Sequence, residues 1–251
     1  MAEWSVASAY QGTAAAEQFS SLARVFELEG EVITNSSLCQ VLRISIGGID
    51  YFVKRYNAPT QGLARLWGIS KAKREWLNLQ RFASWNMSPA PLVAYGEENG
   101  FNRRGVVITE GVPGAIDLAT LAIQHSPLLK NKAWVRTVSA QVAQFTRAMH
   151  DHHFAHNDWK WRNILVNGVA GDLQQQPKVH VIDCPAGAIW YGPLFEYRRV
   201  KDLACLDKVA KYQLTRTQRL YFYKQYTGRN KLTAGDKQTL RKILAFFDGR
   251  E

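Results

Sequence analysis

Three polar side chains lie close together in the stretch AHNDWKWRNILV, residues 155–166. Asp158 is an acid that can take a proton, Lys160 is a cation that can sit beside a phosphate, and Asn163 carries an amide oxygen that can bind a metal ion. This combination suits phosphoryl transfer, in which a hydroxyl attacks a phosphate while cations balance the charge.

The other parts of such a site can also be found in the sequence. Lys54, in the alternating stretch FVKRY, could contact donor phosphates, and Glu75, near the start of a predicted helix, could orient it. Taken singly, each is more simply interpreted as an ordinary surface residue. Asp183 ends the apolar run VHVI, and a strand-end aspartate can share a metal ion with Asn163 across a hairpin.

The context of the D-x-K-x-x-N motif makes it more specific than the motif alone, which is common by chance. His156 and a predicted helix precede it, a predicted strand follows it, and a second strand ends in Asp183. We therefore interpret these residues as one site.

Hydrophobic periodicity predicts the elements that must position the site. Alternation over residues 23–33, 38–46 and 47–56 predicts three strands. Apolar residues at three-residue steps predict a helix over 71–85. A further strand pair is predicted at 92–98 and 104–112, with the polar stretch ENGFN as its turn.

The second half of the chain has mostly helical periodicity. The predicted elements are helices over 117–125 and 132–153, short buried strands at 163–168 and 178–183, and basic helices from about 198 onward. The sequence therefore predicts an α+β protein with a β-rich part at 1–111, containing one key helix, and a mostly helical part at 112–251.

Composition is typical of a globular protein. The chain has 251 residues, 46% of them hydrophobic, which is enough for a large core. It shows neither a signal-peptide pattern nor an apolar run of about 20 residues, so we expect a cytoplasmic protein. Three cysteines without a CxxC spacing do not predict a disulfide framework or a zinc site.

The net charge of +11 is concentrated in the C-terminal third. Residues 1–159 hold 15 Lys and Arg against 13 Asp and Glu, whereas residues 160–251 hold 17 against 8. An anionic partner is indicated, which could be a phosphorylated or carboxylated substrate, an acidic membrane surface or nucleic acid, although a solvated basic face would also explain the bias. Charge alone does not predict nucleic-acid binding, because no recognition module accompanies it.

Several stretches, in this order, resemble the lipopolysaccharide core kinases, a family with a two-lobed protein-kinase-like fold. The resemblance covers about residues 25–225 and is carried by FVKRYN, KREWLNLQRF, PAPLVAYGE, VITEGVPGAIDL, HNDWKWRNILV, VIDCPAG and RRVKDLACL. It implies ATP- and Mg²⁺-dependent phosphorylation of a sugar, such as heptose, in the lipopolysaccharide inner core.

The resemblance also implies a role for each matching residue. Lys54 would contact the ATP phosphates and Glu75 would pair with it, while the connector at Thr109 to Gly111, which includes Glu110, would hold adenine through its backbone. Asp158 would be the catalytic aspartate that receives or orients the acceptor hydroxyl, and Lys160 would stabilise charge on the phosphoryl group. The other implied roles are Mg²⁺ binding by Asn163 and Asp183 and bracing of the loop by His156 and Asp202.

Two departures from protein kinases bear on ATP affinity and regulation. The stretch TNSSL, 34–38, has no glycine where protein kinases carry a glycine-rich phosphate cover, and Asp183 is followed by Cys184 and Pro185. The 18 residues between Asp183 and Asp202 leave little room for a peptide-docking segment, which favours a small acceptor group on a larger molecule.

Alternative interpretations remain open at this stage. The acceptor could be Kdo, a protein or a small molecule, and the altered motifs would also suit a pseudokinase that binds without transferring phosphate. The basic stretch 61–74, with several apolar residues, indicates possible peripheral contact with the inner membrane. We expect His152 and His156 to be structural rather than zinc ligands, and we assign no role to Trp159 or Trp161.

Overall fold

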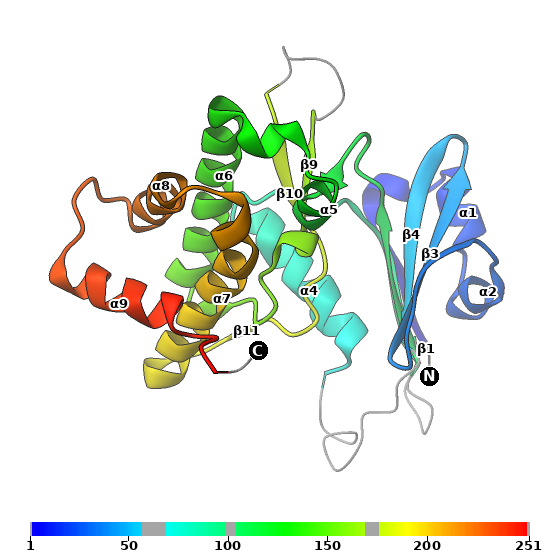
Figure 1. The fold of residues 1–251 in the computed structure, drawn as a ribbon. Coiled ribbons are helices and arrows are strands. Elements are labelled where there is room, and N and C mark those ends of the chain that lie inside the picture. The colour runs from blue at the N-terminus through cyan, green and yellow to red at the C-terminus, as the bar shows by residue number, and fades with distance from the viewer. Residues whose placement is uncertain (1, 57–68, 99–103, 169–175, 250–251) are drawn as a thin grey trace. The chain divides into compact units, whose positions relative to one another are not determined.

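The computed structural model describes residues 2–56, 69–98, 104–168 and 176–249 (Figure 1). By internal packing the chain divides into two compact units. The N-terminal unit comprises residues 1–81 and 89–112, and the C-terminal unit comprises residues 82–88 and 113–251. The division of the chain into parts at 1–111 and 112–251, made from the sequence, stays a prediction.

A six-stranded antiparallel sheet forms the frame of the N-terminal unit, in the order β1-β5-β6-β4-β3-β2. Its strands are β1 (Ala2–Val6), β2 (Glu31–Asn35), β3 (Cys39–Ile46), β4 (Ile49–Tyr56), β5 (Leu92–Glu98) and β6 (Gly105–Glu110). Gly47 and Gly48, with φ of 59° and 81°, form the two-residue turn between β3 and β4. This turn type needs positive φ at both positions, which glycine adopts without strain.

Helices cover both faces of this sheet, and strand alternation decides which side chain meets which helix. One face packs on α1 (Ala14–Gln18) and α2 (Leu22–Glu27), the other on α4 (Lys71–Ser84). Val106 and Ile108 belong to the first core, whereas Val107 between them packs with Trp76 of α4. The period of two therefore places alternate residues in different cores.

The strand predicted over 23–33 is wrong in its first half. Ser21 starts α2 there, because its hydroxyl accepts the backbone N–H of Arg24 at 3.2 Å. Leu22 and Val25 then share the buried helix face at a three-residue spacing. Only from Glu31 does the chain form a strand. The strands β3 to β6 and helix α4 confirm the other predictions for this part.

The C-terminal unit contains short strands and longer helices. They are β7 (Ile116–Asp117), α5 (Leu118–Ile123), η2 (Pro127–Lys130), α6 (Lys132–Asp151), β8 (Phe154–Ala155), η3 (Trp161–Asn163), β9 (Ile164–Asn167), β10 (Lys178–Val181), β11 (Ala188–Ile189), α7 (Gly192–Gln213), α8 (Arg216–Thr227) and α9 (Ala234–Leu244). The predicted helices at 117–125 and 132–153 and both short strands are confirmed, while α7 begins earlier than predicted.

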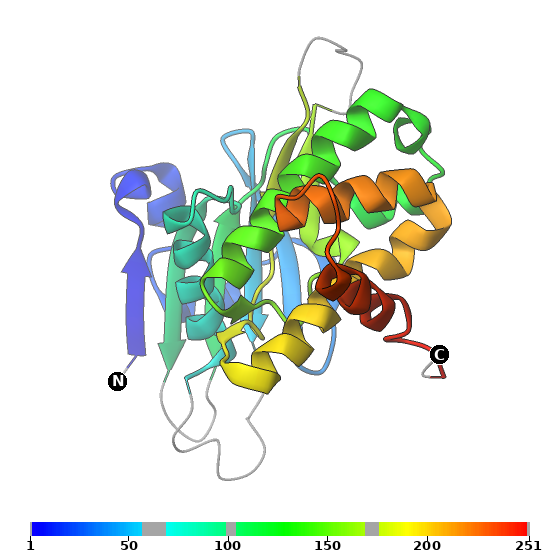
Figure 2. The same cartoon turned by 90° about the vertical axis from the view of Figure 1, so that its left-hand side faces the viewer.

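Four helices share one core in this unit. Ala143 of α6, Leu203 of α7, Tyr223 of α8 and Ile243 of α9 are buried together. Figure 2 shows α8, in orange, beside α6, in green, as their contacts require. This core fixes α7, which follows the chemically important region in the sequence.

None of the helices in the described residues has the length and apolar character required to cross a bilayer.

Candidate active site

Lys54 and Glu75 form an ion pair inside the N-terminal unit. The Nζ of Lys54 lies 3.1 Å from Oε1 of Glu75, and the glutamate side chain is almost completely buried. Strand alternation turns Lys54 toward α4, because its neighbour Val53 is in the opposite core. The hydroxyl of Tyr56, two residues along the same strand, donates to the other oxygen of Glu75. Both donors hold the carboxylate in one orientation beside the lysine.

In the predicted connector around Glu110, two backbone N–H groups form hydrogen bonds within the N-terminal unit. The N–H of Glu110 donates to Pro91 O at 2.9 Å, and the N–H of Gly111 donates to Asp50 O at 2.7 Å. The Glu110 carboxylate accepts from the Tyr10 hydroxyl at 2.7 Å. Burial and this carboxylate raise the pKa of Tyr10. These two N–H groups are thus committed within the unit, and adenine binding by this backbone stays a prediction.

The β9–β10 hairpin brings Asn163 and Asp183 together. Val181 pairs with Ile164, so Asn163, directly before β9, and the residues directly after β10 meet at one end of the ladder. The N–H of Ile182 donates to Asn163 O at 3.1 Å, which continues the pairing by one residue. Asp183 then adopts a left-handed conformation with φ of 62°. Aspartate tolerates this region better than most residues.

Oxygen donors at the end of this hairpin fit a magnesium ion. The amide Nδ2 of Asn163 donates to Asp158 O at 2.8 Å, which fixes the amide plane and leaves its oxygen as the acceptor. Mg²⁺ commonly takes one or two such protein oxygens and completes its shell with phosphate and water. The described residues contain no group of three or more His, Cys, Asp and Glu side chains that could hold a metal by themselves. The role of the pair in metal binding stays a prediction.

Asp158 and Lys160 lie within one solvent-accessible loop. Lys160 Nζ is 2.6 Å from Asp158 Oδ2, and the two side chains are 40% and 45% exposed. The loop of residues 156–163 therefore presents a carboxylate and an ammonium to solvent side by side. A carboxylate in this setting can accept a proton, and an ammonium can approach a phosphate.

Asp202 of α7 anchors the start of the 156–163 loop. Its two carboxylate oxygens accept the backbone N–H groups of His156 and Asn157, at 2.7 and 2.9 Å. The His156 ring is fully buried, stacks on Phe82 and tilts against Trp159. Burial lowers its pKa, which favours the neutral imidazole. The bracing positions that the resemblance implies for these two residues are thus observed.

Both tryptophans of the loop point inward. Trp159 donates its indole N–H to Thr146 Oγ1 at 2.8 Å, and Trp161 donates to Leu206 O at 3.0 Å. Each ring is buried, and together they hold the loop against α6 and α7. With both rings turned inward, Asp158 and Lys160 between and beside them remain toward solvent.

Sequence reasoning missed several residues around this loop. Asn157 has φ of 67° and accepts a hydrogen bond from Arg198 at 3.0 Å. His150 Nδ1 lies 2.9 Å from the Tyr226 hydroxyl, while its Nε2 lies 3.5 Å from Asp202, which is ion-pair distance without hydrogen-bond geometry. Burial raises the pKa of Tyr226 to about 12. The only feature near the D-x-K-x-x-N motif that could have indicated these residues is the asparagine directly before it. The other contacts join residues that are far apart in the sequence.

This arrangement, with a sheet-rich N-terminal unit and a helical C-terminal unit carrying the 156–163 loop, defines a protein of the protein-kinase-like fold class. A solved structure described as "WaaP in complex with acyl carrier protein" has the same fold, with a TM-score of 0.67 and 23% identity over 99% of this chain and 97% of that one. The predicted fold class is confirmed.

Comparison of sequences then gives the family. Residues 47–226 match the lipopolysaccharide kinase (Kdo/WaaP) family, and the chain belongs to this family. The lipopolysaccharide core heptose(I) kinase WaaP of Escherichia coli (strain K12) is 25% identical over 171 residues, which are 65% of this chain and 64% of that protein. A second Escherichia coli protein of that name is 25% identical over 164 residues, 62% of each chain. The chain thus spans less than two thirds of the length of these relatives.

Proposed function

We propose that the protein is an ATP-dependent kinase that phosphorylates a hydroxyl of a lipopolysaccharide inner-core sugar, in particular a heptose. The observation that carries this proposal is the 156–163 loop, in which a braced backbone presents Asp158 and Lys160 to solvent. Family membership adds the substrate class, since the curated relatives are named as heptose kinases.

The roles proposed for the residues follow from their chemistry. Asp158 orients the acceptor hydroxyl and receives its proton, and Lys160 balances charge on the transferred phosphoryl group. The Lys54–Glu75 pair contacts the donor phosphates, and the connector at Thr109–Gly111 contributes to adenine binding. Phosphoryl transfer needs little covalent work from a protein, so positioning and charge should account for most of the rate.

Asn163 and Asp183 are the residues that we propose to hold Mg²⁺. When bound, the ion would neutralise the negative charge of the phosphates. The left-handed Asp183 and the fixed amide of Asn163 contribute to this by keeping two oxygen donors at the end of one hairpin.

The short segment after Asp183 supports a compact acceptor. Only β11 and a few turn residues separate Asp183 from α7, which already begins at Gly192. Asn157 Nδ2 donates to Ala186 O at 2.8 Å and ties this segment to the loop. A sugar hydroxyl suits so short a segment better than an extended peptide does.

Mass spectrometry of lipopolysaccharide cores tests the proposal. We expect cores from cells lacking the gene to lose one phosphate group from one inner-core sugar, and expression of the wild-type gene to restore it. The Asp158→Asn gene, expressed to the same level, should not restore it. Unchanged core phosphate would contradict the proposal, and loss from Kdo instead of heptose would reassign the acceptor.

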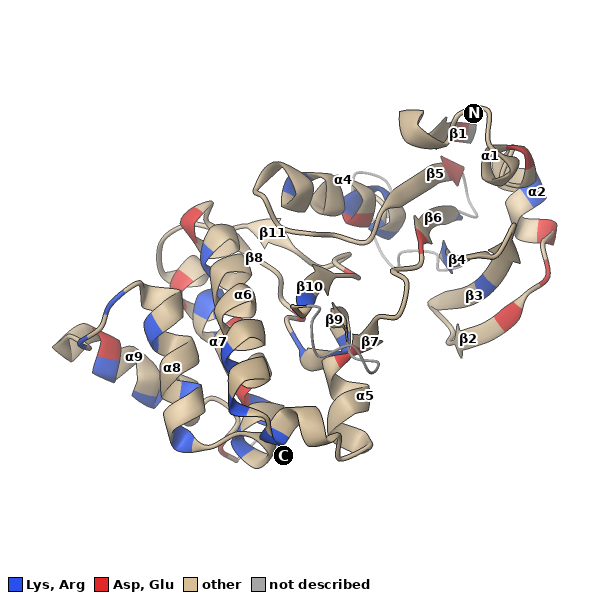
Figure 3. Cartoon of the chain, turned by 90° about the horizontal axis from the view of Figure 1, so that it is seen from above, with Lys and Arg blue, Asp and Glu red and all other residues tan. Residues whose placement is uncertain are grey.

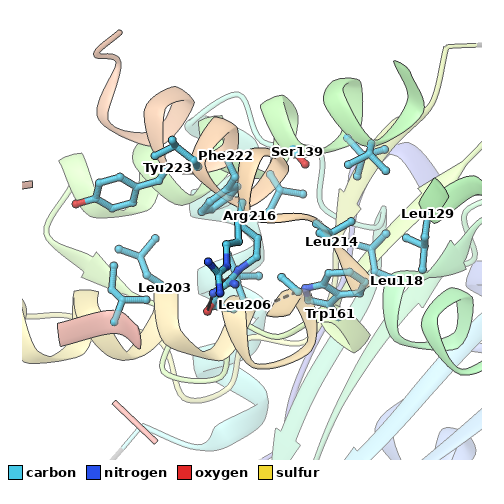
Figure 4. A pocket seen from close by; sticks show the side chains of 18 of the residues that line it. Leu118, Leu129, Ser139, Trp161, Leu203, Leu206, Leu214, Arg216, Phe222 and Tyr223 are labelled. Atoms are coloured by element: carbon cyan, nitrogen blue, oxygen red, sulfur yellow. Dashed lines mark hydrogen bonds and ion pairs between the residues drawn. The ribbon is translucent and has the colours of Figure 1, made fainter. Parts of the chain in front are cut away.

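We also propose acyl carrier protein as a partner, because a solved relative of the same fold is described in complex with it. A cavity of about 560 Å³ in the C-terminal unit is lined mainly by apolar side chains of α6 to α9, including Leu203, Leu206 and Phe222 (Figure 4). This volume falls within the range of ligand pockets. An acyl chain delivered by acyl carrier protein has the chemistry to fill it.

Substitution at the cavity wall tests this partnership. Ala210 lines the cavity, and Ala210→Phe should block it and weaken binding of purified acylated carrier protein in a pull-down. Ala245→Phe, at an exposed position, is the matched control and should bind as the wild type does. Equal binding by both variants would contradict a role for the cavity.

A further inference from the structure

The positively charged side chain of Arg198 contacts the 156–163 loop. It lies on the second turn of α7, where its Nη1 donates to Oδ1 of Asn157 at 3.0 Å. Its guanidinium also stacks over the ring of Trp190, 4.7 Å from the centroid. Asn157 immediately precedes Asp158, the residue that we propose to receive the acceptor proton, so this cation is hydrogen-bonded to the loop one residue before the proposed base.

The charge of Arg198 has no carboxylate partner among the residues that the structure describes. Its neighbour Arg199 differs in this respect, with an ion pair to Glu196 at 2.6 Å and a hydrogen bond to Tyr226. Asp158, the acid nearest in sequence to Asn157, is paired with Lys160. Arg198 is only partly buried, so water can solvate its charge and an anion from solution can replace that water.

The guanidinium is suited to receive such an anion. Arginine has five N–H donors in a planar fork, and the bond to Asn157 uses only one of its nitrogens. Stacking on Trp190 holds the plane in place, so less side-chain freedom is lost when a ligand binds. Tyr191, next to Trp190, is 70% exposed, which shows that the described chain leaves this segment open to solvent.

We propose that Arg198 binds an acidic group of the acceptor, a carboxylate or a phosphate, and thereby gives the enzyme its preference for an anionic sugar. This inference rests on the proposed function. A purely structural role would be different: Arg198 would only hold Asn157 in its left-handed conformation and would influence every acceptor equally.

Steady-state kinetics with four forms of one acceptor separate these roles. The probes are deacylated inner-core oligosaccharide and the same oligosaccharide with its carboxylates methyl-esterified, each also tested after phosphatase treatment. Arg198→Gln keeps an N–H donor for Asn157 but removes the charge. We expect it to raise the KM for the untreated acceptor by about tenfold or more, the range for a hydrogen bond to a charged group, with little change in kcat or in the KM for ATP.

The acceptor in which the bound acid has been removed should no longer distinguish Arg198→Gln from the wild type. If methyl esterification abolishes the difference in KM between the two proteins, the bound group is a carboxylate. If phosphatase treatment abolishes it, the group is a phosphate. Arg198→Lys keeps the charge, so its KM for the untreated acceptor should lie between those of the wild type and Arg198→Gln. Arg241→Gln, an exposed arginine on α9, loses the same charge elsewhere and should behave as the wild type does.

Two results would overturn the inference. One is an equal rise in KM on all treated and untreated acceptors, and the other is a fall in kcat with no change in KM, since both indicate action through the loop alone. Thermal unfolding of Arg198→Gln checks that its fold is intact. A wild-type enzyme that transfers no phosphate to any of these acceptors would instead refute the proposed function, and the inference with it.

Discussion

At the scale of single residues, the site combines exposed reactive groups with buried supports. The Asp158–Lys160 pair is nearly half exposed, and pairs of this kind contribute little to stability. Asn163 and Asp202, by contrast, are almost completely buried. Loss of Asp158 should therefore affect chemistry far more than folding.

We predict that Asp158→Asn lowers kcat by about 10² or more, the range for removal of a general base. ATP binding, measured by calorimetry, should stay within a few-fold of the wild type, because the proposed nucleotide contacts lie on other residues. The carboxamide has nearly the same size, so the loop backbone should be retained. A near-normal kcat would show that another residue takes the proton.

Chemistry-bearing residues could be recognised in the sequence, but their supports could not. Lys54 and Glu75 were predicted as a pair from a strand and a helix, and they lie 3.1 Å apart. Left-handed Asn157 and its bond to Arg198 depend on a contact between residues 41 positions apart. No periodicity in either segment indicates that contact, so it could be recognised only from the three-dimensional structure.

At the scale of elements, α7 determines the conformation of the loop before it. Asp202 accepts two backbone N–H groups, and Leu206 accepts the indole of Trp161. The stretch RRVKDLACL lies within the helical region that the sequence predicts from about residue 198 onward. The helix start at Gly192 was missed, because the exposed apolar residues Leu194 and Tyr197 disguise the helical pattern.

Burial of His156 behind this loop predicts a pH dependence of stability. Burial lowers its pKa in the folded protein, whereas in the unfolded chain it should be near the ordinary value of about 6.5. As pH falls below that value, the unfolded chain takes up the proton first. The free energy of unfolding should then decrease, by no more than about 1.4 kcal/mol per pH unit for this one group.

Urea unfolding at about pH 7.5 and 5.5 measures this effect. His156→Phe keeps a ring against Phe82 and removes the titrating group, so its stability should fall less with acid than that of the wild type. Burial also lowers the pKa of His180, which is why the difference between the two proteins, and not the wild-type slope, is the test. Equal slopes would refute the expectation.

At the scale of the whole molecule, positive charge is concentrated in the C-terminal helices. Residues 198–231 contain ten Lys and Arg against two acids, and Figure 3 shows the basic positions recurring along α7 to α9. The charge bias, the fold class and the family could all be predicted from sequence. Which basic residues lie near the 156–163 loop could not, since this depends on helix packing.

We propose peripheral contact with the cytoplasmic face of the inner membrane and predict sedimentation with vesicles containing phosphatidylglycerol at low salt. Vesicles of phosphatidylcholine alone should not bind, and about 1 M salt should release the protein, because screening then acts within about 3 Å. Most of the stretch 61–74, which the sequence indicates for this contact, lies outside the described residues. Leu66→Ser, within it, tests whether apolar insertion adds to charge. Protein left in the supernatant with anionic vesicles at low salt would exclude this contact.

Trp161 belongs both to the 156–163 loop and to the wall of the apolar cavity shown in Figure 4. A compound bound in that cavity would contact the loop through the Trp161 indole, which donates a hydrogen bond to Leu206 O. It would not have to compete with a nucleotide for its place. For inhibitor discovery, this makes the helical interior a target whose blockers should act noncompetitively toward ATP.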